Sequence, residues 1–307
     1  MIRQLLLPAL ALLLLAGCNE TGNTKKQEPM NTTESPAPTK KSIPDSISGY
    51  APVNGLSMYY EIHGNGQPLV VIHGGGSTIQ TTFGNILPLL AEHYKVIAVE
   101  LQAHGHTKDR GKPSSFEQDA DDVAALLQQL KIDKAAVLGF SNGGSAALQI
   151  AIRHPAIVSK LVAISAVSKR NGMIPGFFEG MKNASLNNMP KPLQDAYLKI
   201  TGDTNGLQVM HDRDKNRMLQ FTDWPDSDLM SIKAPTLLIS SDKDVILPQH
   251  TLEMAQKIPH ASVMILPGIH GALIGEVCTA APGSKMPAIT VALMSDFLDT
   301  PVEPGTK

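Results

Sequence analysis

The chain has 307 residues and a formal net charge of −2. This balance argues against a nucleic-acid-binding protein, which would carry a strong excess of Lys and Arg. Hydrophobic residues make up 42% of the chain, so a well-buried core can form. Beyond the polar N-terminal region, about 260 residues remain, which is enough for one large α/β domain.

Residues 1–17 have the pattern of an export signal. Arg3 supplies a positive charge, and the apolar run 5–15 is too short to span a bilayer comfortably. The tetrapeptide Leu15-Ala16-Gly17-Cys18 follows this run and resembles the lipobox of bacterial lipoproteins. The resemblance implies cleavage before Cys18 and lipidation of its thiol and new amino terminus. The alternative is an ordinary signal peptide with an unrelated cysteine.

We therefore expect an exported protein that is anchored to the bacterial cell envelope through lipid at Cys18. Asn19 after this cysteine favours the outer membrane if the cell is Gram-negative. Residues 18–48 are polar and lack periodicity, so we expect a disordered tether. The folded domain is predicted over 49–299, with a short tail over 300–307. Cys278 is the only other cysteine, so lipidation of Cys18 leaves no intramolecular disulfide.

Strand and helix patterns alternate through the first half of this domain. Leu69-Val70-Val71-Ile72 is a continuous apolar run, as in a strand buried on both faces of a parallel sheet. His63-Gly64-Asn65-Gly66 is predicted to form the hairpin turn before it. The alternation predicts a doubly wound, mostly parallel sheet. The predicted strands are 56–62, 69–72, 95–99, 134–138 and 161–164, with helices over 83–93, from Ser115 to about 130, and from 143 to Pro155.

The alternation stops between residues 168 and 231, where prolines and glycines separate short amphipathic pieces. We expect a small helical cap inserted over the strand ends. Its pliable apolar side chains suit an acyl or aromatic substrate, although each could equally pack the cap against the body. These side chains are Met173, Met181, Met189, Met210, Met218, Met230, Phe177, Phe178 and Phe221.

Gly139-Phe140-Ser141-Asn142-Gly143 lies between a predicted strand and a predicted helix. A Gly-x-Ser-x-Gly match alone is weak, but this context is that of a nucleophile elbow. Side chains two residues from Ser141 would collide with so sharp a turn, and Gly139 and Gly143 remove them. We interpret Ser141 as a catalytic nucleophile.

A serine nucleophile needs a base and an acid that orients the base. His270 follows the last predicted strand, 262–266, and Asp244 follows the strand that starts at Thr236. The order Ser, acid, His is that of α/β-hydrolases, and each group falls at a strand end. Asp242 competes for the role of the acid. We favour Asp244 because its spacing to Pro248 fits the family pattern.

With these motifs the chain resembles enzymes of the α/β-hydrolase fold over residues 49–299. The resemblance rests on His73-Gly74, on the Gly105 loop after the strand 96–99, on the Ser141 elbow, on Asp244-x-x-x-Pro248 and on His270-Gly271. It implies an α/β-hydrolase fold and a reaction for which we expect no cofactor. Many relatives carry Arg-Gly where this chain has Gln102-Ala103, which puts the contacts of that Arg in doubt.

The resemblance also implies roles for individual residues. Ser141 would be the nucleophile, His270 the general base and acid, and Asp244 the carboxylate that orients His270. The oxyanion hole would be the backbone N–H groups of Asn142 and Gly75, with Gly76 as the nearest substitute.

We expect the remaining histidines to have structural roles or to be solvated, and not to take part in catalysis. His73 is expected to hold the oxyanion loop by hydrogen bonds. His104, His106 and the group His211, Asp212 and Asp214 are expected to be solvated loop residues, because no metal-ligand spacing appears. We expect no bound metal.

The expected function is a serine hydrolase that cleaves carboxylic esters of small or medium acyl groups through an acyl-Ser141 intermediate. The same triad could instead serve a lactonase, an amidase, a carbon–carbon bond hydrolase or a cofactor-free perhydrolase or haloperoxidase. A more distant alternative is a lipoprotein binding module that has lost the chemistry. The oligomeric state is not readable from the sequence.

Overall fold

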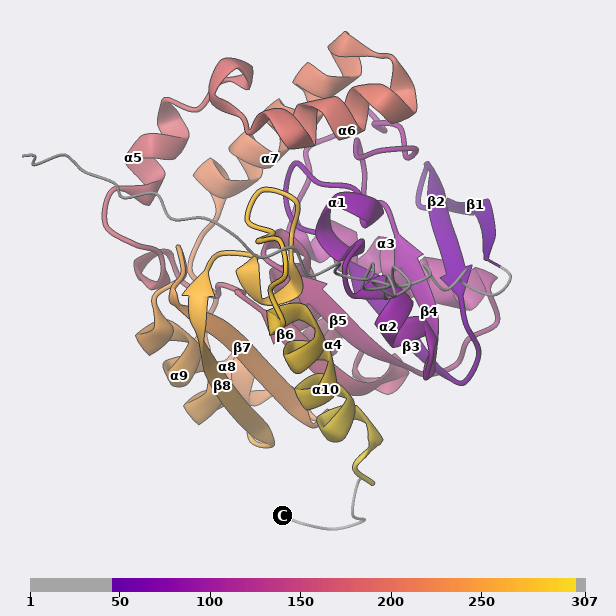
Figure 1. Ribbon diagram of the computed structural model, residues 1–307, viewed down its shortest axis with the longest axis vertical. Helices are drawn as coiled ribbons and strands as arrows, with labels where there is room; N and C mark the ends of the chain where they lie inside the picture. The colour runs from indigo at the N-terminus through magenta and orange to yellow at the C-terminus, as the bar shows by residue number, and fades with distance from the viewer. Residues whose placement is uncertain (1–45, 302–307) are drawn as a thin grey trace, which may run out of the picture. The chain divides into compact units, whose positions relative to one another are not determined.

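The computed structural model describes residues 46–301 and contains an eight-stranded sheet with helices on both faces (Figure 1). The expected export signal over 1–17, Cys18, residues 19–45 of the expected tether and residues 302–307 of the tail lie outside the described residues. The strands are β1 (Ile47–Val53), β2 (Leu56–His63), β3 (Gln67–Ile72), β4 (Tyr94–Val99), β5 (Ala135–Phe140), β6 (Val158–Ile164), β7 (Thr236–Lys243) and β8 (Ala261–Ile269).

The sheet has the order β1-β2-β4-β3-β5-β6-β7-β8. All neighbours from β4 to β8 are parallel, whereas β2 pairs antiparallel with β1 and β4. The expected doubly wound, mostly parallel sheet is therefore confirmed. Its parallel strands bring the segments that follow them to one edge, where Ser141, Asp244 and His270 lie.

The predicted hairpin between the strands at 56–62 and 69–72 is wrong. β4 lies between β2 and β3, so residues 63–66 connect strands that do not pair. Leu69, Val70, Val71 and Ile72 are all fully buried, and such a strand is covered on both faces and needs an inner position in the sheet. The antiparallel β2, with its exposed and half-buried side chains, lies nearer the edge.

The true hairpin joins β1 to β2, and the sequence analysis missed β1. Its turn is Asn54-Gly55, with φ of 44° and 84° at the two residues. Positive φ at both positions is the geometry of a type I′ turn, which Asn-Gly favours. β1 begins at Ile47, two residues before the start expected for the domain.

The expected helix over 83–93 is two short helices instead, α1 (Ile79–Phe83) and α2 (Leu87–Ala91). Thr78 caps the first, so that helix begins earlier than expected. Pro88 lacks an N–H and fits only a first helical turn, which explains why a new helix starts beside it.

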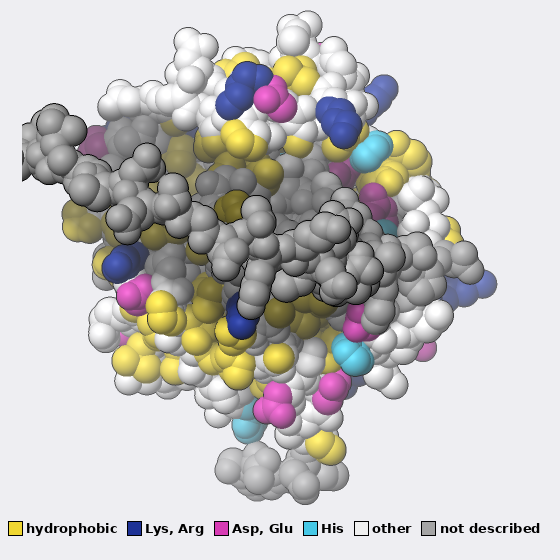
Figure 2. Space-filling model, viewed as in Figure 1, with side chains coloured by type: hydrophobic (Ala, Val, Ile, Leu, Met, Phe, Trp, Pro, Cys, Tyr) yellow, Lys and Arg dark blue, Asp and Glu magenta, His cyan; other side chains and the backbone are white. Residues whose placement is uncertain are grey.

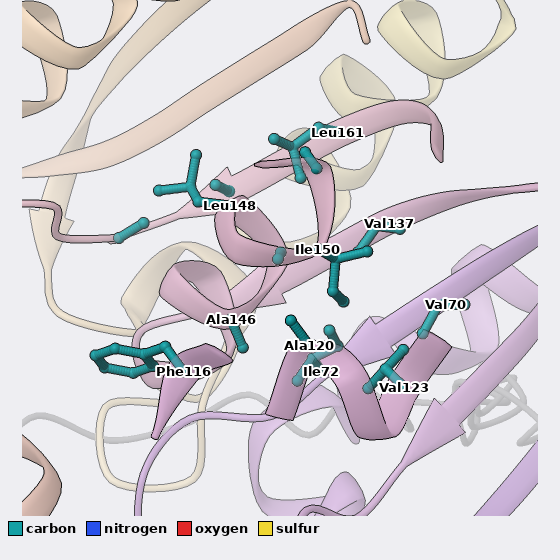
Figure 3. Close-up of a cluster of buried hydrophobic side chains, with 14 of the residues drawn as sticks. Val70, Ile72, Phe116, Ala120, Val123, Val137, Ala146, Leu148, Ile150 and Leu161 are labelled. Carbon is teal, nitrogen blue, oxygen red and sulfur yellow. The ribbon is translucent and has the colours of Figure 1, made fainter. Parts of the chain in front are cut away.

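The helices on the two sheet faces pack against alternate side chains of the strands. Val70 and Ile72 of β3 belong to the core cluster of α3 (Phe116–Gln129) and α4 (Asn142–Arg153), and Leu69 and Val71 belong to the opposite cluster. Figure 3 shows Ala120 and Val123 of α3 near Val70 and Ile72. Each fully buried side chain of this size contributes about 1.5–3 kcal/mol relative to exposure. The elbow between β5 and α4 thus rests on a rigid core.

Four helices fill the insertion between β6 and β7, which confirms the expected helical cap. They are α5 (Phe177–Lys182), α6 (Lys191–Thr201), α7 (Thr204–Gln220) and α8 (Asp226–Met230). In Figure 1, α5, α6 and α7 lie over the end of the sheet toward which the parallel strands point. Short 3₁₀ turns occur at Pro155–Ile157, Arg170–Gly172, Leu186–Asn188 and Ala272–Ile274.

The C-terminal part of the domain closes the sheet with α9 (Pro248–Lys257), the edge strand β8 and α10 (Met286–Asp299). Hydrophobic side chains gather on the face that carries β8 and α10, where Ile265, Ile269 and Ile289 are exposed (Figure 2). Among the helices of residues 46–301, none has the length and hydropathy needed to cross a membrane.

Candidate active site

Ser141 occupies the turn between β5 and α4 in a conformation that side chains rarely adopt, with φ 56° and ψ −119°. Such backbone strain persists only where the surroundings impose it. Close packing does so here: a Cβ on Gly139 would lie 2.0 Å from the Gly143 carbonyl oxygen, and one on Gly143 would lie 2.2 Å from that of Ile72. Gly139 therefore lets the first turn of α4 pack against β5, and Gly143 lets it pack directly on β3.

One chain of hydrogen bonds joins Ser141, His270 and Asp244 across three strand ends. His270 Nε2 lies 3.1 Å from Ser141 Oγ, and His270 Nδ1 lies 2.6 Å from Asp244 Oδ1. Because a carboxylate can only accept, Nδ1–H donates to Asp244, which leaves the Nε2 lone pair facing the Ser141 hydroxyl. This is the geometry in which an imidazole removes a proton from serine.

Asp244 is buried and its carboxylate is almost fully satisfied. Besides His270, it accepts from the Ser165 hydroxyl at 2.5 Å, from Ile246 N–H at 3.1 Å and from Ser241 N–H at 3.4 Å. Burial alone would raise the pKa of Asp244, but the hydrogen bond and charge of His270 outweigh it and lower the pKa. Asp244 therefore stays ionised at neutral pH.

Asp242, the competing acid, lies in an exposed position on β7. Its Oδ1 accepts a hydrogen bond from Gly268 N–H at 2.7 Å. That contact ties the end of β7 to β8 and makes no use of His270.

Ser165 is a site residue that the sequence analysis missed. It directly follows β6 with φ 52°, is buried, and donates to Asp244 Oδ2. Its contact with a residue 79 positions later has no signal in the sequence.

The glycine-rich loop after β3 is held by His73. His73 is buried, its Nδ1–H donates to Gly74 O at 2.8 Å, and its Nε2 accepts from Leu101 N–H at 3.1 Å. Burial, followed by the charge of the neighbouring His104, lowers the pKa of His73 to about 3. His73 is therefore a neutral support of this loop.

Gly75 and Asn142 line the same pocket as Ser141, and among the described residues each has a backbone N–H group without a partner. Within residues 46–301, neither Gly75 N–H nor Asn142 N–H forms a hydrogen bond, and the second is one of the unpaired donors at the start of α4. A Cβ on Gly75 would lie 2.5 Å from the Asn142 side-chain nitrogen, so the two residues are adjacent. Gly76 N–H, by contrast, donates to Asp214 at 2.6 Å and is not free.

The expectation that His104 and Asp214 are solvated loop residues is wrong. The side chain of His104 is 1% exposed, and its Nε2 lies 2.9 Å from Asp214 Oδ2. Its Nδ1 lies 2.8 Å from the Gln102 carbonyl oxygen, so both ring nitrogens donate and the ring is an imidazolium. Burial lowers the pKa of His104, but the charge of Asp214 outweighs it and raises the pKa overall. His106 and Asp212 are more exposed, but His211 is not a solvated loop residue either: it lies with Asp212 on helix α7, its side chain is 10% exposed, and it lines the pocket described below.

A pocket of about 380 Å³ opens above Ser141 and His270 and is roofed by the cap. Its apolar wall includes Met173, Met181, Met189, Met218 and Phe177. Met210 packs in a separate cluster formed mainly by cap helices α6 and α7, and Met230 is exposed, so only part of the expected set lines the pocket. A larger hollow of about 750 Å³ lies elsewhere, beside α3, and no Ser, Thr or Cys lines it.

Within the described part of the chain, no group of three or more His, Cys, Asp or Glu side chains could hold a metal ion.

Residues 67–199 match the family model described as alpha/beta hydrolase fold. Among solved structures, the enol-lactonase of Burkholderia xenovorans aligns with a TM-score of 0.64 and 22% identity, over 82% of this chain and 100% of its own. A 2-hydroxy-6-oxo-6-phenylhexa-2,4-dienoate hydrolase of Rhodococcus aligns with a TM-score of 0.67 and 18% identity, over 83% and 99%. The chain has the α/β-hydrolase fold, as expected.

Curated relatives by sequence include the serine hydrolase BPHL of Homo sapiens, 29% identical over 221 residues, which cover 67% of this chain and 73% of the relative. An acetyltransferase component of the acetoin cleaving system of Pseudomonas putida is 29% identical over 73% of this chain. The chain spans only 65% of that second relative. Fold and relatives together support a hydrolase of the α/β-hydrolase fold.

Proposed function

We propose that the protein is a serine hydrolase that cleaves carboxylic esters through an acyl intermediate on Ser141. The observation that carries this proposal is the hydrogen-bonded series from Ser141 through His270 to Asp244, at 3.1 Å and 2.6 Å, at the base of an apolar pocket. A serine in this arrangement is a nucleophile at neutral pH because His270 takes its proton as it attacks.

The chemistry proceeds in two transfers. Ser141 Oγ attacks the ester carbonyl carbon while its proton moves to His270 Nε2, and the carbonyl oxygen becomes an oxyanion near the N–H groups of Gly75 and Asn142. His270 then gives the proton to the leaving alkoxide as the C–O bond breaks. In the second transfer His270 takes a proton from water, the hydroxide attacks the acyl group, and Ser141 recovers its proton as the acid leaves.

The pocket favours small or medium acyl groups with apolar surface. A volume of about 380 Å³ is at the lower end of the range for small-molecule sites. Methionine side chains adapt to ligands of differing shape, which fits a tolerant acyl site. A lactone is a cyclic ester and would use the same steps, and the solved structures with this fold include an enol-lactonase.

The test is hydrolysis of chromogenic p-nitrophenyl esters of two to eight carbons by the full chain in detergent, with Ser141→Ala as control. We expect Ser141-dependent turnover that peaks at short or medium length. A panel containing a lactone, an anilide and a vinylogous diketone distinguishes ester cleavage from the alternatives. Turnover no greater than that of Ser141→Ala on every substrate would contradict the proposal.

We further propose that lipid on Cys18 holds the enzyme at the cell envelope. The support is the lipobox-like Leu15-Ala16-Gly17-Cys18, which follows an apolar run of signal-peptide length. The partner in this proposal is the membrane lipid alone, and the substrate is a small ester.

A further inference from the structure

Asp214, on helix α7 of the cap, reaches the glycine-rich loop of the body. Its Oδ2 accepts from Gly76 N–H at 2.6 Å and from His104 Nε2–H at 2.9 Å. The first contact joins residues 138 positions apart, and the second joins residues 110 positions apart. A cap side chain is therefore part of the structure that supports the free N–H groups beside Ser141.

The contacts on either side of Gly75 determine where its N–H points. That N–H belongs to the planar peptide whose carbonyl is Gly74 O, and this oxygen is held by His73. The next peptide carries Gly76 N–H, which Asp214 holds, and the Gly75 carbonyl, which accepts from Ser77 Oγ at 3.3 Å. With both peptides held, Gly75 cannot rotate, although glycine is the most flexible residue.

A carboxylate this close to a developing oxyanion would repel it unless its charge were balanced. The groups facing Asp214 supply that balance: the His104 imidazolium, and Arg217, whose Nη1 lies 3.6 Å from Asp214 Oδ1. Arg217 in turn lies 2.9 Å from Asp119 on α3. Two cations and two anions thus form a buried cluster with no net charge, in which Asp214 acts mainly as a hydrogen-bond acceptor.

The same face of α7 is tied to the body at a further point. Arg213 Nε and Nη2 donate to the two oxygens of Asp109 at 3.0 Å and 2.7 Å, a bidentate pair. Together with the pairs made by Asp214 and Arg217, this anchors α7 over the loops that follow β3 and β4. The helix is therefore a fixed support for the glycine-rich loop.

We infer that Asp214 is a positioning residue for the oxyanion hole. Helix α7 of the cap supplies this residue, which fixes Gly76 N–H and thereby the direction of Gly75 N–H. This inference rests on the proposed hydrolysis at Ser141. If so, the cap helps to stabilise the oxyanion of the transition state in addition to lining the pocket.

The test compares Asp214→Asn with wild type and with Asp195→Asn, which changes an exposed aspartate on α6 that pairs with Lys191. The amide oxygen of asparagine can still accept from Gly76 N–H, but the neutral side chain loses the ion pair with His104 that holds this oxygen in place. Losing one oxyanion donor entirely costs on the order of 100-fold in turnover, so a loosened donor should cost about tenfold. We expect kcat of Asp214→Asn to fall at least fivefold with KM within threefold, while Asp195→Asn keeps both.

A merely structural role would lower Tm and leave kcat per folded molecule unchanged, so a kcat within fivefold of wild type, or a loss through KM alone, overturns the inference. If Asp214→Asn does not fold, the double variant Asp214→Leu/His104→Leu replaces the buried pair by apolar side chains, which is often tolerated. The same thresholds apply to it. Absence of Ser141-dependent turnover in wild type would instead contradict the proposed function, so the two failures are distinguishable.

Discussion

Two aspartates separated by one residue lie at the end of β7, Asp242 within the strand and Asp244 directly after it, and of the two only Asp244 contacts His270. Asp244 is buried and bonded to His270 Nδ1, whereas Asp242 is exposed and bonded to Gly268 N–H. An amide at position 244 would keep the shape of the carboxylate and lose its charge. It would then favour the wrong His270 tautomer and would not stabilise the imidazolium.

We expect Asp244→Asn to lower kcat by about 10³-fold or more, since loss of the orienting carboxylate in a comparable triad costs about 10⁴-fold. Asp242→Asn should stay within about threefold of wild type. Steady-state kinetics on one ester measures both variants. A larger loss from Asp242→Asn than from Asp244→Asn would reverse the assignment of the acid.

Site residues whose role depends on partners far away in the chain could not be predicted from the sequence. Ser141, Asp244 and His270 were predictable because each follows a strand, and parallel strands end at one edge of the sheet. Ser165 and Asp214 carry no comparable motif. Their significance depends on contacts across 79 and 138 residues, which only the folded chain reveals.

The local sequence pattern predicted which segments form strands of the sheet, but it did not predict which strands pair with each other. The apolar runs of β3 to β6 correctly indicated buried strands, but the order in which strands pair left no local trace, and β2 was wrongly joined to β3. β1 was missed because its burial alternates and its residues are mostly polar or small. The Asn54-Gly55 turn was the available signal for it.

The contact of α4 with β3 gives the elbow its rigidity. A substitution that adds one methyl group at this contact tests it. In Gly143→Ala the new Cβ would lie 2.2 Å from Ile72 O and 2.4 Å from His73 O, so the backbone must move. We expect a loss of about 3 kcal/mol in unfolding free energy, at the upper end for an overpacked core. Urea denaturation followed by circular dichroism measures it.

Gly180 in α5 is the matched control, because a Cβ there meets no atom within 4 Å. Gly180→Ala should stabilise the protein by up to about 1 kcal/mol, since Ala is the better helix former. The two Gly→Ala changes therefore have opposite expected signs. Equal effects, or a Gly143→Ala variant as stable as wild type, would show that the elbow does not pack on β3 as described.

At the scale of the whole molecule, the proposed lipid at Cys18 would confine the hydrolase to a membrane surface. Replacing Cys18 by Ser removes the thiol that would carry the lipid. We expect Cys18→Ser to move from the membrane pellet to the soluble fraction of a bacterial host, or to be mislocalised, as judged by fractionation and immunoblotting.

The control is Cys278→Ser, which changes the free, exposed cysteine of the hydrolase domain. This variant should stay in the pellet with the wild type. If Cys18→Ser also stays there, Cys18 is not the anchor, and the proposal of a lipoprotein fails without affecting the chemistry at Ser141.

The proposed hydrolysis requires Ser141 to be the activated nucleophile. The most direct measurement is to label the full chain with a fluorophosphonate probe, digest it and map the modified residue by mass spectrometry. Ser141 Oγ should carry the phosphonyl group, and Ser141→Ala should remain unlabelled. A folded wild-type protein that takes up no probe, or that takes it up at another serine, would contradict the claim.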